Sequence, residues 1–171
     1  MAYVDTNVLI AHYFEESKEH QGAEKIVEKL RREGGRAFAS SLTVVELASV
    51  ISRNILKYEA MIPPHIRMYD ERRKIRVLVK HMLKSLGSKV ADDKPSVERL
   101  DEAEAFHIFR RAVDHAPHLK LRALDLLHVA YALQLAEEGL LDVFATLDEG
   151  IVGRRDIMEG LGLKVYGPED A

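Results

Sequence analysis

Apolar and polar positions follow one another along the chain in a pattern that predicts strands separated by helices. Short apolar runs of strand-forming residues occur at 2–4, 36–39, 97–100, 143–146 and 164–166. Apolar residues at helical spacing lie between these runs, most regularly at 18–33, 43–58 and 121–138. Strands that alternate with helices indicate a parallel sheet covered on both faces. We therefore expect an α/β fold.

Turn and cap signals predict the remaining elements. Residues 8–13 are expected to form a short helix after the first strand, and 88–95 a polar loop. Asp101 with Glu104 has the spacing of a capping box and predicts a helix to about residue 114, before Pro117. Two further helices are expected, at 64–86 and 151–160. We expect a single domain over 1–171, with a helical, basic insertion at about 57–96.

Charge is distributed unevenly along the 171 residues. The net charge is −3, but 67–89 contains eight Lys and Arg against Asp70 and Glu71, which gives that segment a charge of +6. A basic segment on an acidic body is suited to a polyanion, or is simply a solvated helix face. The chain has no cysteine, no apolar run that could span a bilayer and no basic signal-peptide start. We expect a cytoplasmic protein that does not contact a membrane.

Asp5 is the first candidate for a functional residue. It follows the apolar run Ala2-Tyr3-Val4 and precedes a helix, so its carboxylate is expected at the carboxyl end of a strand. In open parallel sheets, ligands bind at this edge. The alternative is that Asp5 or Asn7 only caps the helix.

Three later acids share this setting. Glu46 lies early in a helix after the second strand, where it also fits a capping box with Thr43. Asp125 lies in a helix that is apolar nearly all round, where a carboxylate requires a cation, an ion pair such as Arg122, or a proton. Asp148 follows the strand at 143–146 and also fits a helix cap.

Two kinds of neighbour accompany these acids. Thr146 could donate a hydrogen bond at the same edge, and His128 lies three residues after Asp125, where a satisfied core histidine is the commoner outcome. Four carboxylates at one sheet edge cannot all ionise without a cation between them. Hard oxygen ligands without cysteine favour Mg²⁺ or Mn²⁺. Such a centre activates water and stabilises phosphoryl oxygens.

Four segments together resemble the PIN-domain ribonucleases, and most closely their VapC-type branch, the toxins of prokaryotic toxin–antitoxin pairs. The segments are Tyr3–Ile10, Ser40–Leu47, Leu121–Ala130 and Phe144–Asp148, in the order of the family. The resemblance implies a three-layer α/β/α sandwich around a mainly parallel sheet of four to five strands. It also implies cleavage of RNA with Mg²⁺ or Mn²⁺.

The resemblance further implies a role for each acid. Asp5, Asp125 and Asp148 would hold metal, and Glu46 would orient or deprotonate the attacking water. Thr6 and Thr146 match hydroxyl positions beside the acids. Such toxins are often homodimers inhibited by a small antitoxin protein. The chain departs from the compact toxin pattern in its long 57–96 segment and in Glu149.

Two other functions remain open from the residues. One is a PIN-like module that binds RNA or protein without cutting, through the basic segment. The other is a phosphotransfer or haloacid-dehalogenase-like phosphate enzyme, which ranks last because the Asp-x-Asp pair of those phosphatases is absent: position 7 is Asn.

Overall fold

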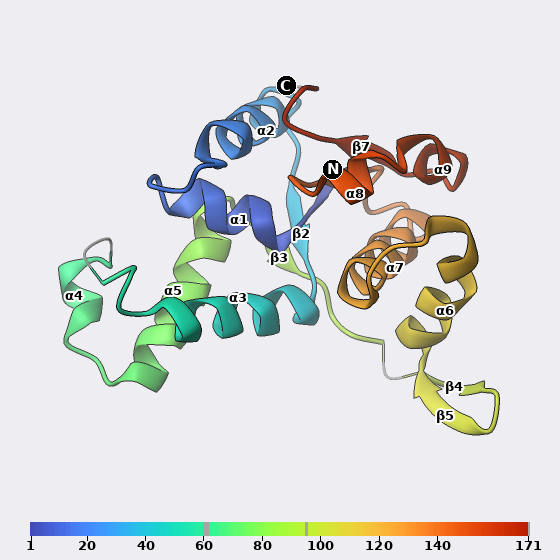
Figure 1. The fold of residues 1–171 in the computed structure, drawn as a ribbon, viewed down its shortest axis with the longest axis horizontal. Coiled ribbons are helices and arrows are strands. Elements are labelled where there is room, and N and C mark those ends of the chain that lie inside the picture. The colour runs from blue at the N-terminus through green and yellow to red at the C-terminus, as the bar shows by residue number, and fades with distance from the viewer. Residues whose placement is uncertain (60–61, 95, 171) are drawn as a thin grey trace.

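The structure is a computed structural model that describes residues 1–59, 62–94 and 96–170. Its elements alternate along the chain as the hydrophobic pattern predicts (Figure 1). They are β1 (Ala2–Val4), α1 (Thr6–Tyr13), α2 (His20–Arg32), β2 (Ala37–Ala39), α3 (Ser41–Asn54), α4 (Pro64–Arg67), α5 (Glu71–Ser85), β3 (Lys89–Val90), β4 (Val97–Leu100), β5 (Ala103–Phe106), α6 (His107–Leu119), α7 (Ala123–Glu137), β6 (Val143–Ala145), α8 (Glu149–Val152), α9 (Arg155–Gly160) and β7 (Lys164–Tyr166).

A five-stranded sheet in the order β3-β2-β1-β6-β7 forms the middle layer, and all its pairings are parallel. Successive side chains of β1 point to opposite faces, which separates two cores. Ala2 and Val4 pack with α1, α2, α3 and α5, whereas Tyr3 packs with α6, α7, α8 and α9. The α/β/α sandwich with a mainly parallel sheet is therefore confirmed.

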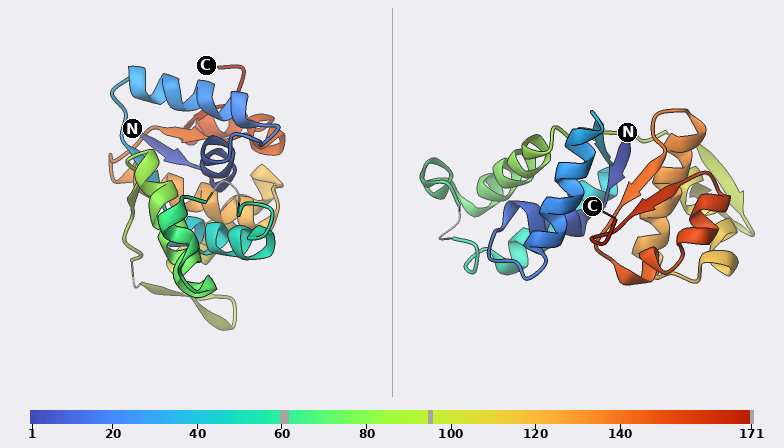
Figure 2. Two further views of the ribbon diagram at one scale, coloured as in Figure 1. Left: turned by 90° about the vertical axis from the view of Figure 1, so that its left-hand side faces the viewer. Right: turned by 90° about the horizontal axis from the view of Figure 1, so that it is seen from above.

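Two parts of the chain extend outward from the sheet and its covering helices (Figure 1). α4 and α5 form one end, and the hairpin of β4 and β5 projects at the other (Figures 1 and 2). In none of the described helices are length and apolar character combined to the degree that crossing a bilayer requires.

Several predicted elements are corrected. The helix expected over 64–86 is two helices, because Asp70 caps α5 by accepting a hydrogen bond from the backbone N–H of Arg73 at 2.9 Å. The loop expected at 88–95 contains β3, which extends the sheet beside β2; Pro95 lies outside the described residues. The helix expected over 151–160 is likewise divided into α8 and α9.

The region after residue 96 differs most from expectation. Residues 97–100 form a strand, but it pairs antiparallel with β5 in a separate hairpin. The capping box at Asp101 and Glu104 is wrong, because Asp101 occupies the hairpin turn with a left-handed φ of 51° and Glu104 lies in β5. α6 begins only at His107 and contains Pro117 in its last turn, where the missing N–H costs one hydrogen bond.

Candidate active site

The candidate active site lies at the carboxyl ends of the two neighbouring strands β1 and β6. Asp5 follows β1, and Thr146 and Asp148 follow β6. Two helices complete the site: α3, which contains Glu46, and α7, which contains Asp125 and His128. Figure 1 shows α1, α3 and α7 around this edge of the sheet.

Asp5 is buried, with only 6% of its surface exposed, and both its oxygens accept hydrogen bonds. Oδ1 accepts from the backbone N–H of Thr6 at 2.7 Å, so the predicted cap of α1 is correct. Oδ2 accepts from Thr146 Oγ1 at 2.7 Å and from Asn7 Nδ2 at 3.0 Å. Burial raises the pKa of Asp5, and the nearby Glu46 carboxylate adds a smaller increase, against lowering by His128 and by hydrogen bonds.

Asn7 and Thr146 fasten the loop after β6 to the start of α1. Asn7 Oδ1 accepts a hydrogen bond from the backbone N–H of Leu147 at 3.1 Å, and Thr146 Oγ1 accepts one from that of Asp148 at 3.0 Å. The hydroxyl of Thr146 thus links the Asp5 carboxylate to the backbone of Asp148. From the sequence, Asn7 was expected at most to cap a helix. Its contact with Leu147, in the loop after β6, arises only because β1 pairs with β6.

Glu46 faces the site, and the capping box predicted for it with Thr43 is wrong. The N-terminus of α3 is capped instead by Ser40 and Thr43, which bond each other reciprocally. The Oε2 atom of Glu46 accepts from Thr6 Oγ1 at 2.6 Å and lies 2.7 Å from His128 Nε2. The hydrogen bond from His128 is the main cause that lowers the pKa of Glu46, so this carboxylate is ionised at neutral pH.

His128 and Tyr3 belong to this site, although the sequence pattern favoured a satisfied core residue for His128 and did not indicate Tyr3. His128 is 2% exposed, and its Nδ1 lies 2.7 Å from the hydroxyl of Tyr3, which is fully buried. The Tyr3 hydroxyl also contacts Ser40 Oγ at 2.7 Å and Thr43 Oγ1 at 3.2 Å. The available signal was the position of His128 one helical turn after Asp125. Tyr3 gave no polar signal, because it reads as an ordinary strand residue.

Asp125 lies in the first turn of α7 and is half-buried. Burial raises its pKa most, followed by the negative charges of Asp148 and Asp5. Of the groups that affect the pKa of Asp125, Arg122 has the smallest effect, which is to lower it. Within the described residues, no ion pair joins Arg122 to Asp125 within 4.0 Å. The negative charges of Asp5 and Asp148 therefore both act on Asp125, and like charges gathered in this way favour a cation.

Asp148 caps α8, as the alternative for this residue predicted. Its Oδ1 accepts from the backbone N–H groups of Gly150 and Ile151 at 2.7 and 3.1 Å. A carboxylate has more acceptor positions than these two bonds use. The cap therefore fixes the side chain and leaves lone pairs for a further ligand.

The donor set suits a hard divalent cation. Ligand atoms of Asp5, Glu46 and His128 lie within 4.8 Å of one another. Asp125 and Asp148 are not in this group, but the negative charges of Asp5 and Asp148 both raise the pKa of Asp125. Carboxylate oxygens are the ligands that Mg²⁺ and Mn²⁺ prefer. A cation here would offset the burial and mutual repulsion that raise the pKa values of Asp5 and Asp125.

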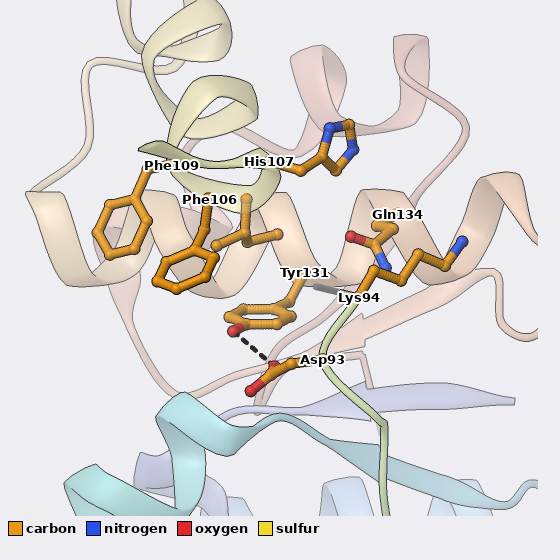
Figure 3. Close-up of a pocket in the computed structure, with 8 residues that line it drawn as sticks. Asp93, Lys94, Phe106, His107, Phe109, Tyr131 and Gln134 are labelled. Carbon is orange, nitrogen blue, oxygen red and sulfur yellow. Dashed lines mark hydrogen bonds between the residues drawn. The ribbon is translucent and has the colours of Figure 1, made fainter. Parts of the chain in front are cut away.

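A separate cavity of about 190 Å³ lies between α6, α7 and the segment before β4 (Figure 3). Phe106, Phe109 and Tyr131 line it, and the Tyr131 hydroxyl bonds Asp93 Oδ1 at 2.9 Å. Tyr131 also contacts Ser41 Oγ at 3.1 Å, so it ties this segment to α3. None of the four predicted acids lines this cavity, which is distinct from the candidate active site.

Comparison with known proteins identifies one family. A family model described as PIN domain matches residues 2–153, which covers most of the chain and all four acids. A search among curated proteins finds no match to the chain.

Proposed function

Because the chain belongs to the PIN-domain family, whose members are generally nucleases, we propose that it is a metal-dependent endoribonuclease. The single observation that supports this most is the convergence at one sheet edge of four acids from distant parts of the sequence: Asp5, Glu46, Asp125 and Asp148. The raised pKa values of Asp5 and Asp125 show that their ionised forms are unfavourable in the protein alone. This supports a bound cation, whose positive charge would stabilise the ionised carboxylates.

In this proposal Asp5, Asp125 and Asp148 hold Mg²⁺ or Mn²⁺, directly or through water. When bound, such an ion lowers the pKa of water and stabilises charge on phosphoryl oxygens. Glu46 orients the attacking water and accepts its proton, for which its lowered pKa keeps it ionised. Thr6 holds one oxygen of Glu46, and Thr146 holds one oxygen of Asp5.

RNA binding is supported by the outer face of α5. Arg72, Arg76, Lys80 and Lys84 are exposed and follow one another at intervals of four residues, so they form a basic stripe along the helix. Such a stripe can follow a phosphate backbone, which contributes sequence-independent affinity.

A toxin role in a toxin–antitoxin pair is part of the same proposal, with a small antitoxin protein as inhibitor and a homodimer in the cytoplasm. It is supported by the resemblance of the four acid-containing segments to the VapC-type branch. Exposed apolar side chains, among them Phe106, Phe109 and Val113, offer surface for such a partner.

Substitution of the aspartates tests the nuclease. Asp5→Asn and Asp125→Asn are each expected to lower Mn²⁺-dependent cleavage of single-stranded RNA by at least about 100-fold. The matched control is Asp156→Asn, the same chemical change at an exposed position in α9. Equal cleavage by the two site variants and the control, with unchanged circular dichroism, would contradict the proposal.

A second candidate, an RNA-binding module that does not cleave, is favoured by the basic stripe on α5 alone. It predicts RNA binding that depends on Arg72, Arg76, Lys80 and Lys84, and no cleavage products at any Mn²⁺ concentration. Calorimetric titration of the metal-free protein with Mn²⁺ separates the two, because the module does not require a bound cation.

A further inference from the structure

We propose that His128 and Tyr3 are positioning residues for Glu46, and that His128 is not a ligand of the metal. This inference rests on the proposed function, since it assigns to Glu46 the contact with the attacking water. It concerns a continuous chain of side-chain contacts that runs from the start of α3 through β1 and α7 back to α3.

The chain of contacts is short at every step and is buried as far as His128, whereas Glu46 at its end is partly exposed. The Tyr3 hydroxyl contacts Ser40 Oγ at 2.7 Å and His128 Nδ1 at 2.7 Å, and His128 Nε2 contacts Glu46 Oε2 at 2.7 Å. Tyr3, Ser40 and His128 are between 0% and 2% exposed. The Tyr3 ring is itself fixed, because it stacks on Phe144 with ring centroids 5.4 Å apart.

The chemistry of the groups assigns the direction of each hydrogen bond. The ionised Glu46 carboxylate can only accept, so His128 Nε2 carries a proton and donates it. In the neutral ring, Nδ1 is then an acceptor and receives the O–H of Tyr3. The hydroxyls of Ser40 and Thr43 are left as donors to the Tyr3 oxygen. Each member thereby fixes the orientation of the next.

This arrangement bears on which groups would meet a cation. The His128 ring lies close enough to Asp5 and Glu46 to complete a three-ligand set. However, Nε2 and Nδ1 both make hydrogen bonds, and ligation would break one of them. Glu46 Oε1, by contrast, has no hydrogen bond to any described residue. The contacts of Oε2 with Thr6 and His128 therefore fix one oxygen and leave the other for water.

Two amide variants of His128 test whether its hydrogen bond to Glu46, and not only its volume in the core, is required. His128→Gln retains an N–H donor near the position of Nε2. His128→Asn carries the same amide group on a shorter side chain, so its N–H cannot reach Glu46. For His128→Asn we expect kcat to fall by about 10–100-fold, with KM and Mn²⁺ affinity within about twofold of the unsubstituted protein. We expect His128→Gln to recover most of the lost kcat.

Tyr3→Phe tests the next step, because it removes one hydroxyl and preserves the ring stack on Phe144. We expect a smaller loss of kcat, of about tenfold, which corresponds to one hydrogen bond to a positioned group. Tyr131→Phe is the matched control. It also removes a hydroxyl with two polar contacts on α7, but Tyr131 has no contact with Glu46.

Crystal structures of the metal-free variants provide a readout that does not depend on cleavage. His128→Asn should leave Glu46 in a different or disordered side-chain conformation, whereas Tyr131→Phe should leave it unchanged. An unchanged Glu46 conformer in His128→Asn would overturn the proposal, whether or not the protein cleaves RNA. A loss of Mn²⁺ affinity of tenfold or more in both His128 variants would instead identify His128 as a ligand, which also overturns it.

Discussion

Thr146 Oγ1 lies 2.7 Å from Oδ2 of Asp5, a contact that joins residues 141 positions apart. The same hydroxyl oxygen accepts a hydrogen bond from the backbone N–H of Asp148 at 3.0 Å. One fully buried hydroxyl therefore sets the position of the first acid relative to the last. This places an uncharged residue among those on which the geometry of the site depends.

Removal of this hydroxyl should weaken the site more than the fold. Thr146→Val preserves the size of the side chain but leaves the Asp148 N–H without its acceptor, at a cost of about 1–3 kcal/mol in the free energy of unfolding. We expect RNA cleavage to fall by about 10–100-fold, as for other groups that orient metal-binding carboxylates. Thr146→Ser is the control, since it retains the hydroxyl, and equal activity of the valine and serine variants would contradict this account.

Asp125→Asn should stabilise the metal-free protein at neutral pH. Asp125 has a raised pKa in the folded protein, so its ionised form opposes folding. The associated stability is fully present below the pKa of the unfolded chain and is lost as pH rises through the pKa of the folded state. After allowance for solvent screening of this half-buried group, we expect the melting temperature to rise at neutral pH by up to about 2–4 °C.

Thermal melts of both proteins across pH test that sign. The difference between Asp125→Asn and the unsubstituted protein should disappear at low pH, where both have an uncharged group at this position. Asp156→Asn, at an exposed position, should show no such pattern. A melting temperature of Asp125→Asn that lies below that of the unsubstituted protein at neutral pH, with the difference disappearing at low pH, would show that the charge at Asp125 is stabilising.

Mn²⁺ should stabilise the unsubstituted protein through the candidate active site. A ligand that binds only the folded state stabilises it by about 2.7 kcal/mol at 100 times its Kd. We expect Mn²⁺ to raise the melting temperature of the unsubstituted protein, and to have a much smaller effect on Asp5→Asn. A shift of equal size in both proteins would show that the ion binds elsewhere. Titration with EDTA should abolish the shift.

The basic stripe on α5 should determine the salt dependence of RNA binding. Replacement of Arg72, Arg76, Lys80 and Lys84 by Gln is expected to lower the slope of log affinity against log salt by up to about 3. The measurement is fluorescence anisotropy with single-stranded RNA, without divalent ions so that no cleavage occurs. The control replaces four exposed basic residues elsewhere: Lys25, Arg31, Arg32 and Lys164. Equal slopes for the two sets of variants would show that the basic stripe contributes no more to RNA binding than other exposed basic residues.

Local sequence patterns predicted most elements of the fold. The strand at 164–166 and the helices around 18–33 and 121–138 follow from periodicity and from stop signals such as Gly139, which adopts a φ of 71°. Between residues 64 and 119 the strand at 97–100 is confirmed, but the helix boundaries, the loop at 88–95 and the capping box at Asp101 were predicted wrongly. There Asp70 caps a helix and Asp101 lies in a hairpin turn. Local residue preferences distinguish these outcomes poorly from a continuous helix at 64–86 and a helix that begins at Asp101, because packing outweighs such preferences. The packing of the hairpin against α6 favours the turn at Asp101, and the packing of α5 on α1 and α3 favours the cap at Asp70.

By itself, the sequence determined that acids follow β1 and β6, because apolar runs that end in Asp are visible without a structure. It also predicted a carboxylate in the buried helix α7, where charge is costly. Only the tertiary structure decided that Glu46 bonds His128 rather than its own helix terminus, and that Tyr3 completes the contact. The physical reason is that caps and periodicity depend on neighbours within a few residues. The partners of Glu46 and Tyr3 lie 82 and 125 residues away, and only the packing of α3 and α7 on the sheet brings them within hydrogen-bond distance.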